Sequence, residues 1–214
     1  KINHAHVVGG PTATIESVEE LLDVPVDYYV RLNFYAFVDV VNALDGIKFN
    51  VPYDIREKDS SDVHYTYVKE GAQTLNGEEA LAVARTRHAD SDIERGKRQQ
   101  QILQAIVKKA TSFNSITKYD EMLEAVGSNM RTDMTFSEMK SLINYGESDR
   151  GLNYESLALK GSDDFLSSGA YIYRADEAEL EVIKGKLQRH LGIDSPDTDS
   201  NEDSESEEES FTTE

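Results

Sequence analysis

Residues 26–52 read VDYYVRLNFYAFVDVVNALDGIKFNVP, and this stretch decides the predicted fold. Over residues 26–34, apolar and polar side chains alternate, which is typical of a strand with one face in the core. Residues 35–44 change to helical spacing, and Gly46 is placed to end that helix. Residues 47–51 alternate again. The order strand, helix, strand predicts an α/β fold in which the helix crosses over the sheet.

The flanking sequence predicts further helices and a few short strands. Helices are predicted at residues 12–23, 76–84, about 94–112, 119–127, 135–145 and 176–191, and strand-like pieces at 65–68, near 153–159 and at 170–173. The rest of residues 53–75 is polar and is predicted to be irregular. Asn76 is a predicted N-cap with Glu79 reaching back to it, and Thr135 with Glu138 repeats that pattern.

Length and composition exclude several classes of protein. The chain has 214 residues and no cysteine, so it has neither a disulfide framework nor a thiolate metal site. No run of about 18 apolar residues is present, so these residues contain no predicted membrane span. The chain begins at Lys1 rather than at Met, which we interpret as a processed or truncated form.

Negative charge is concentrated at the C-terminus. Residues 194–214 hold ten of the 41 acidic residues and no Lys or Arg, which predicts a disordered acidic tail acting as a solubilising spacer. Without this tail, the formal charge of −19 falls to −9 for residues 1–193, which we take as the globular domain. An acidic domain argues against nucleic acid as a partner.

Residues 84–101, ARTRHADSDIERGKRQQQ, gather cations within this acidic chain. The cations are Arg85, Arg87, Arg95, Lys97 and Arg98. A bound anion would explain such a cluster, and the planar fork of arginine suits phosphate. The alternative is that these cations pair with the acidic residues that interrupt them, namely Asp90, Asp92 and Glu94.

The spacing of the cations suits a diphosphate. Arg85 and Arg87 would point to one face if the backbone there is extended. Arg95 and Gln99 lie four apart at the start of a helix and share a face, next to free N–H groups. Two arginines from a loop and one from a helix could therefore surround a diphosphate, and a nearby carboxylate could help to bind a metal cation with the phosphates.

Other polar groups carry weaker signals. His4 and His6 follow Lys1 and would share a face on a strand, but a pair without a third ligand predicts no metal site. Neither a Walker-type phosphate loop nor a GxSxG elbow is present. His88 and His190 are interpreted as surface residues, and residues 131–133 as a turn and cap.

Four segments together resemble the LytR-CpsA-Psr family of Gram-positive cell-envelope proteins. They are KINHAHVVGGP (1–11), residues 26–52, GAQTLNGEEALAVARTRHADSDIERGKRQQQILQAIV (71–107) and MRTDMTF (130–136). The motifs KINHA, YYVRxNF, LNGEEALAxxRxR and ERxxRQQ occur in that order, which makes the resemblance specific.

The resemblance implies a phosphotransferase that works outside the cell. Such proteins move an anionic glycopolymer from an undecaprenyl-pyrophosphate carrier to a muramyl hydroxyl of peptidoglycan; the polymer is wall teichoic acid, capsule or a secondary wall polymer. The implied fold is a three-layer α/β/α sandwich with a mixed central sheet. By match to the family's motifs, Arg85, Arg87, Arg95, Gln99 and Lys1 would bind the pyrophosphate.

The family's catalytic and Mg²⁺-binding aspartates precede its KINHA motif, at which this chain begins. We therefore expect residues 1–193 to lack N-terminal strands and the single-pass membrane anchor, to be inactive alone, and to oligomerise through an exposed sheet edge. The rival interpretations are a transcriptional attenuator of envelope genes and a non-catalytic scaffold that binds the lipid carrier.

Overall fold

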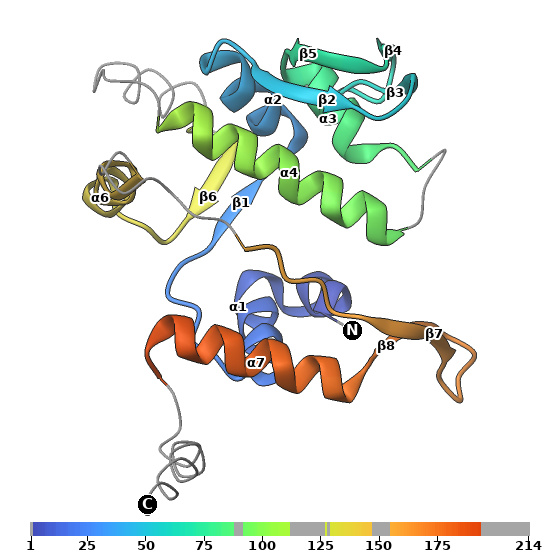
Figure 1. The fold of residues 1–214 in the computed structure, drawn as a ribbon, viewed down its shortest axis with the longest axis vertical. Coiled ribbons are helices and arrows are strands. Elements are labelled where there is room, and N and C mark those ends of the chain that lie inside the picture. Colours follow the sequence, from blue (N-terminus) through green and yellow to red (C-terminus); the bar gives the residue numbers. More distant parts are fainter. Residues whose placement is uncertain (1, 88–91, 112–126, 128, 147–154, 194–214) are drawn as a thin grey trace, which may run out of the picture. The chain divides into compact units, whose positions relative to one another are not determined.

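The computed structural model describes residues 2–87, 92–111, 127, 129–146 and 155–193. The chain forms two compact units, residues 26–158 and residues 1–25 with 159–214, each of which is described by itself (Figure 1). Both combine helices with short antiparallel strands, so the α/β class is confirmed. Of the predicted helix at 119–127 only residue 127 is described, and the acidic tail, Lys1 and His88 lie outside the described residues.

The unit of residues 26–158 contains most of the elements. They are β1 (Val30–Leu32), α2 (Phe34–Ala43), β2 (Ile47–Val51), β3 (Ile55–Lys58), β4 (Tyr65–Val68), β5 (Gly71–Leu75), α3 (Gly77–Arg85), α4 (Asp92–Ala110), β6 (Met130–Thr132) and α6 (Phe136–Gly146). Three antiparallel pairs form among the strands: β1 with β6, β2 with β5, and β3 with β4.

The predicted crossover between β1 and β2 is wrong, because the two strands belong to different pairs. β1 is also shorter than the predicted strand at 26–34, and its three residues are exposed. The Asn33 side chain accepts a hydrogen bond from the Ala36 amide at 2.8 Å, which starts α2 and ends the strand. β6, the strand that pairs with β1, includes Arg131 and Thr132. The predicted turn at 131–133 is therefore corrected to a strand end.

The sequence missed β3 and β5, because both are polar strands. β3 reads IREK, and its buried side chain is Ile55. β5 reads GAQTL and buries Leu75. One side of each strand therefore packs inward, while the other side carries polar side chains that hide the strand signal.

The core of this unit lies where α2, α3 and α4 meet β2, β3, β4 and β5. Its buried residues are Val41, Ile47, Val51, Ile55, Val68, Leu75, Ala80, Ala82, Val83 and Ile102. Ile47 and Val51 confirm the predicted inward face of β2, and Ile102 lies on the predicted apolar stripe of α4. This core fixes α3 and α4 against each other.

Local capping signals were predicted correctly. The Asn76 side chain accepts from the Glu79 amide at 3.0 Å, while the Glu79 carboxylate accepts from the Asn76 amide at 2.9 Å. Thr135 and Glu138 form the same reciprocal pair at α6. Such a box satisfies donors that a helix start otherwise leaves free, so it sets where α3 begins.

The second unit holds α1 (Ile2–Leu22), β7 (Gly161–Phe165), β8 (Tyr171–Ala175) and α7 (Glu177–Leu191). α1 begins earlier than predicted, and its two helical runs meet at Gly10, whose φ of 66° and ψ of −151° are non-helical. His4 and His6 therefore lie on a helix, where a spacing of two does not put them on one face, so the strand geometry considered for them is wrong. β7 begins after the predicted piece near 153–159.

Candidate anion-binding site

The predicted site lies where α3 ends and α4 begins. Arg85 is the last residue of α3, and the following Thr86 is extended, with φ −56° and ψ 141°. Arg87 lies one residue further and is exposed. Arg95 is near the start of α4, on the same face as Gln99. The extended segment expected to carry both Arg85 and Arg87 therefore begins only at Thr86, because Arg85 still belongs to α3.

Arg85 is held by the loop between β3 and β4. Its guanidinium donates to the Asp59 carbonyl at 3.1 Å and to the Asp62 carboxylate at 2.8 Å, and its carbon Cζ lies 4.5 Å from the centre of the Phe34 ring. Its side chain is 22% exposed, so it is not fully buried. A hydrogen bond from the Ser61 hydroxyl holds the pKa of Asp59 below its usual range.

Both ends of α3 hold this loop. Near the helix start, the Glu78 carboxylate accepts hydrogen bonds from the Ser60 amide, at 2.9 Å, and from the Ser60 hydroxyl. At the helix end, Arg85 donates to the Lys58 carbonyl at 3.5 Å in addition to its Asp59 and Asp62 contacts. The position of Arg85 is therefore fixed from two sides.

Arg98 holds α4 to the end of α3. Its side chain is buried, at 4% exposure, and donates from Nε to the Val83 carbonyl at 2.6 Å and from a terminal nitrogen to the Thr86 carbonyl at 2.7 Å. A third bond reaches the Tyr53 hydroxyl at 3.3 Å. These carbonyls belong to the helix end, where intrahelical donors run out, so Arg98 serves as a C-terminal cap from another helix.

Gln99 adds to this cap. Its amide nitrogen donates to the Ala84 carbonyl at 3.1 Å, and its side chain is exposed. An amide has two N–H groups. The second N–H of Gln99 can therefore serve a ligand while the first holds α3.

The acidic partners differ from those that the sequence suggested. Arg85 pairs with Asp62, which lies far from the cationic segment in the sequence. Lys97 does pair with a neighbour, because its ammonium lies 2.7 Å from the Glu94 carboxylate. Asp90 and the side chain of Asp92 lie outside the described part of the chain.

An apolar groove of about 320 Å³ adjoins the cations. Its apolar walls are Phe34 and Phe37 of α2, Leu81 and Ala84 of α3, and Ile102 and Leu103 of α4; Arg85 and Gln99 complete its lining. Leu103 is 61% exposed, so one wall opens to solvent. Sequence reasoning did not name these residues, because the three helices that supply them meet only in the fold.

The described residues supply no metal centre at this site. Among them, no group of three or more His, Asp or Glu side chains could hold a metal ion. The Asp62 carboxylate is already bound to Arg85, and the Glu94 carboxylate to Lys97. No described helix combines the length and apolar character that crossing a bilayer requires.

Thr86 lies between Arg85 and Arg87, and its substitution tests the local packing. Its hydroxyl oxygen is buried, and within the described structure it has no hydrogen-bond partner. Replacing Thr86 with the isosteric valine removes this unsatisfied group, so we expect the free energy of unfolding to rise by about 1 kcal/mol. Urea unfolding of both proteins measures the change, and a less stable Thr86→Val protein would show that the hydroxyl is satisfied in solution.

Comparison with known proteins relates this chain to a family. The model of the LytR_cpsA_psr family matches residues 1–189. An uncharacterized protein of Staphylococcus aureus is 44% identical over 94% of this chain and 49% of its own length. The polyisoprenyl-teichoic acid–peptidoglycan teichoic acid transferase TagT of Bacillus subtilis is 40% identical over 90% of this chain and 60% of its own length. This chain thus spans about half to three fifths of these relatives.

Solved structures agree with the sequence match. The crystal structure of Bacillus subtilis TagV is 36% identical, with a TM-score of 0.78 over 91% of this chain and 76% of that one. A structure of TagT bound to LIIa-WTA is 37% identical, with a TM-score of 0.74 over 90% of this chain and 72% of that one. The family match over residues 1–189 and these structural likenesses lead to one conclusion: the chain belongs to the LytR-CpsA-Psr family.

Proposed function

We propose that this chain is part of a phosphotransferase that moves an anionic glycopolymer from a polyprenyl-pyrophosphate carrier to peptidoglycan. The observation that carries the proposal is an apolar groove whose lining includes Arg85, the last residue of α3, with Arg87 two residues further along the chain. A lipid diphosphate has the same two parts, an apolar chain and a compact anionic head. The similarity to TagT, a polyisoprenyl-teichoic acid–peptidoglycan teichoic acid transferase, supports this class of substrate.

The proposed binding mode divides the substrate between the walls and the rim. The first isoprenyl units lie against the phenylalanine and leucine side chains of the groove, where burial of apolar surface stabilises them. The diphosphate lies beside Arg85, Arg87 and Arg95, with a hydrogen bond from Gln99. Lys1 belongs to the proposed site through its family motif alone, because it lies outside the described residues.

The proposed chemistry is a phosphoryl transfer. A muramyl hydroxyl oxygen attacks the phosphorus that carries the polymer, a phosphodiester bond forms, and the bond to the second phosphate breaks, which releases polyprenyl phosphate. Charge accumulates on the phosphate oxygens along this path, so fixed arginines stabilise it. Arg85, Arg87 and Arg95 are the cations that this chain contributes in this proposal, and we assign no proton acceptor among the described residues.

Mg²⁺ fits this chemistry, but the described residues do not form its site. Phosphate oxygens with one or two carboxylates are the usual ligands of this ion, and the Asp62 carboxylate is engaged by Arg85. The charge neutralisation described here therefore rests on the arginines alone. We further propose that the whole protein is anchored in the cell membrane with this region on the outer face.

Titration of a short-chain polyprenyl pyrophosphate tests the proposal. We expect binding by the wild-type chain and at least about tenfold weaker binding by Arg87→Ala/Arg95→Ala, since each charge-assisted contact to phosphate contributes about 1 kcal/mol or more. Lys108→Ala/Lys109→Ala, near the other end of α4, removes the same charge and is the matched control. Calorimetry with and without MgCl₂ measures both.

Two further ligands separate the contribution of the diphosphate head to binding from that of the isoprenyl tail. The matching polyprenol lacks the diphosphate and should show no difference between the wild-type and the double-arginine variant. Inorganic pyrophosphate lacks the tail and should bind more weakly than the lipid. Equal affinity of both double variants for the lipid diphosphate, or no binding by a folded wild-type chain, would contradict the assignment of this site.

A further inference from the structure

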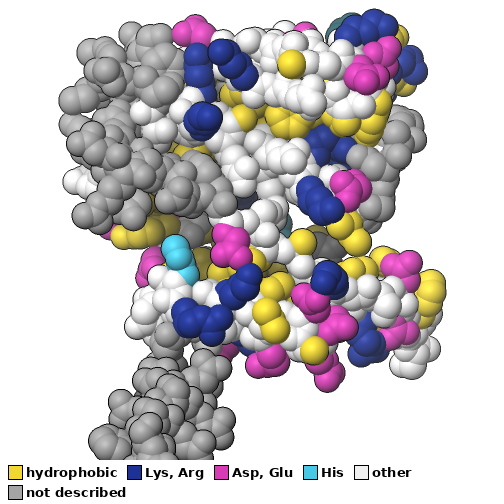
Figure 2. All heavy atoms as spheres, viewed as in Figure 1, with side chains coloured by type: hydrophobic (Ala, Val, Ile, Leu, Met, Phe, Trp, Pro, Cys, Tyr) yellow, Lys and Arg dark blue, Asp and Glu magenta, His cyan; other side chains and the backbone are white. Residues whose placement is uncertain are grey.

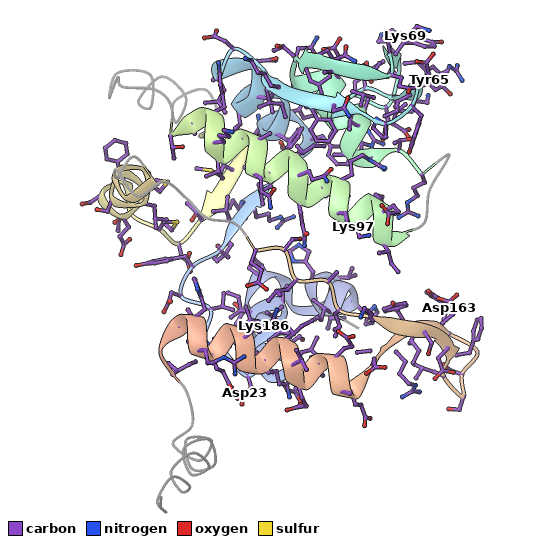
Figure 3. All side chains as sticks on the ribbon, in the orientation of Figure 1. Asp23, Tyr65, Lys69, Lys97, Asp163 and Lys186 are labelled. Atoms are coloured by element: carbon purple, nitrogen blue, oxygen red, sulfur yellow. The ribbon has the colours of Figure 1, made fainter. Side chains whose placement is uncertain are left out.

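The outer face of the β3–β4 hairpin carries two cations and two tyrosines. Arg56 pairs with Tyr67 across the strands, and Lys58 pairs with Tyr65. The neighbouring positions Ile55 and Val68 are buried, so alternation puts these four side chains together on the opposite face. We call Arg56, Lys58, Tyr65 and Tyr67 the hairpin face; Tyr65 is labelled in Figure 3 at the start of β4.

Arg56 is held in a fixed position on this face. Its carbon Cζ lies 3.6 Å from the centre of the Tyr65 ring and 5.7 Å from that of Tyr67. Its Nε donates to the Tyr67 hydroxyl at 2.9 Å, and this bond raises the pKa of Arg56. A hydrogen bond with the Tyr65 side chain adds to this rise. An oriented guanidinium that is exposed to solvent, as that of Arg56 is, can donate to a pair of phosphate oxygens.

Neither cation of the hairpin face has a carboxylate partner among the described residues. Lys58 donates to the Asp62 carbonyl at 3.1 Å, and its ammonium lies 4.7 Å from the centre of the Tyr65 ring. By contrast, Lys69 at the end of the same hairpin pairs with Asp54 at 2.8 Å. Figure 2 shows Lys and Arg side chains next to Asp and Glu at the corner that the hairpin occupies, so carboxylates are close by.

Arg56 and Lys58 both lie over the Tyr65 ring instead of pairing with a carboxylate, although the chain has a formal charge of −19. Two cations held side by side in this way create a local positive potential that attracts an anion. The two cations are also two residues apart on one strand, which separates their Cα atoms by about 7 Å. That spacing suits neighbouring anionic groups on one extended polymer better than a single small anion.

The hairpin face is connected to the lipid-diphosphate site. The Lys58 and Asp59 carbonyls, at the end of β3, accept hydrogen bonds from Arg85. A ligand anchored by its diphosphate near Arg85 therefore has the hairpin beside it. Tyr67, which is 67% exposed, adds an aromatic surface on which a sugar or polyol can pack.

We propose that the hairpin face binds phosphodiester groups in the polymer portion of the substrate. This inference rests on the proposed function, and it adds a subsite that recognises the repeating anionic chain rather than the lipid carrier. Arg56 supplies the oriented fork, Lys58 a second charge, and the tyrosines hold both in place. The subsite would favour polymers with backbone phosphates over neutral glycans.

The test uses a glycerol-phosphate oligomer without a lipid, titrated into the chain by calorimetry. We expect Arg56→Gln/Lys58→Gln to bind it about tenfold more weakly than wild type. Lys48→Gln/Lys69→Gln makes the same change of charge at two exposed residues, one in β2 and one just after β4, and should stay within about twofold of wild type. Tyr67→Phe keeps both charges but frees the guanidinium, so a loss of about threefold is expected.

The same four proteins are then titrated with the short-chain polyprenyl pyrophosphate. Each should bind it as wild type does, because the hairpin face does not contact the carrier in this proposal. If the two double variants bind the oligomer equally, or if a folded wild-type chain does not bind it, the subsite is refuted. Intact lipid binding in that case would leave the proposed function standing, and thermal unfolding confirms that every variant is folded.

Discussion

Replacing Arg98 with methionine is expected to lower the free energy of unfolding by about 3 kcal/mol or more. Methionine fills much of the same volume but donates no hydrogen bond. The Val83 and Thr86 carbonyls would then lose their donors at a buried helix end. Each buried carbonyl left without a donor costs about 1–3 kcal/mol.

Comparing Arg98→Met with two other variants separates the effect of losing this cap from the effect of losing a positive charge. Lys97→Met removes the neighbouring exposed cation and its pair with Glu94, so a change of no more than about 1 kcal/mol is expected. Arg98→Lys keeps the charge but cannot reach both carbonyls at once, and should recover only part of the loss. Urea unfolding midpoints rank the three, and an Arg98→Met protein as stable as Lys97→Met would refute the cap.

Replacing Gly77 with alanine is expected to lower the free energy of unfolding by about 3 kcal/mol or more. A Cβ atom at this position would lie 2.3 Å from the Val38 carbonyl oxygen and 2.7 Å from the Val38 Cα atom. These are backbone atoms of α2 and cannot move aside as a side chain does. The Gly77 amide also donates to the Asn42 side chain at 2.8 Å, which holds the two helices at this distance.

Gly96 provides the matched control. It lies inside α4, and a Cβ atom there would meet nothing within 4 Å. Gly96→Ala should therefore raise the free energy of unfolding by about 0.5–1 kcal/mol, because alanine loses less backbone entropy in a helix. Opposite signs for the two glycine substitutions, measured by thermal or urea unfolding, would confirm the close approach of α3 to α2; equal effects would contradict it.

The sequence predicted those features that depend on neighbours along the chain. Asn76 and Glu79 needed only a spacing of three to form a capping box, and Ile47 and Val51 needed only alternation to mark a buried face. β3 was missed because only Ile55 of its four residues is buried. Strand pairing depends on distant residues, so the assignment of β1 to β6 could not be read from local pattern.

In the candidate site, too, features that depend on chain neighbours were predicted and features that depend on distant residues were not. The gathering of cations was visible in the sequence, but Arg98 and Arg85 look alike there. Their roles differ because Arg98 meets carbonyls at the end of α3, while Arg85 meets a loop more than twenty residues earlier. Residue type gave the chemistry of the cluster, and the fold alone decides which members stabilise the protein and which can serve a ligand.

The salt bridge between Arg85 and Asp62 makes ligand binding there an exchange reaction. A phosphate that takes the guanidinium fork competes with a carboxylate already in contact at 2.8 Å, so the measured affinity is the difference between two ion pairs. Asp62 is 64% exposed and can be rehydrated when released, which keeps the cost of that release small. In the absence of ligand, the Asp62 carboxylate thus occupies the anion-binding position at Arg85. A weakly binding anion such as chloride therefore displaces it poorly.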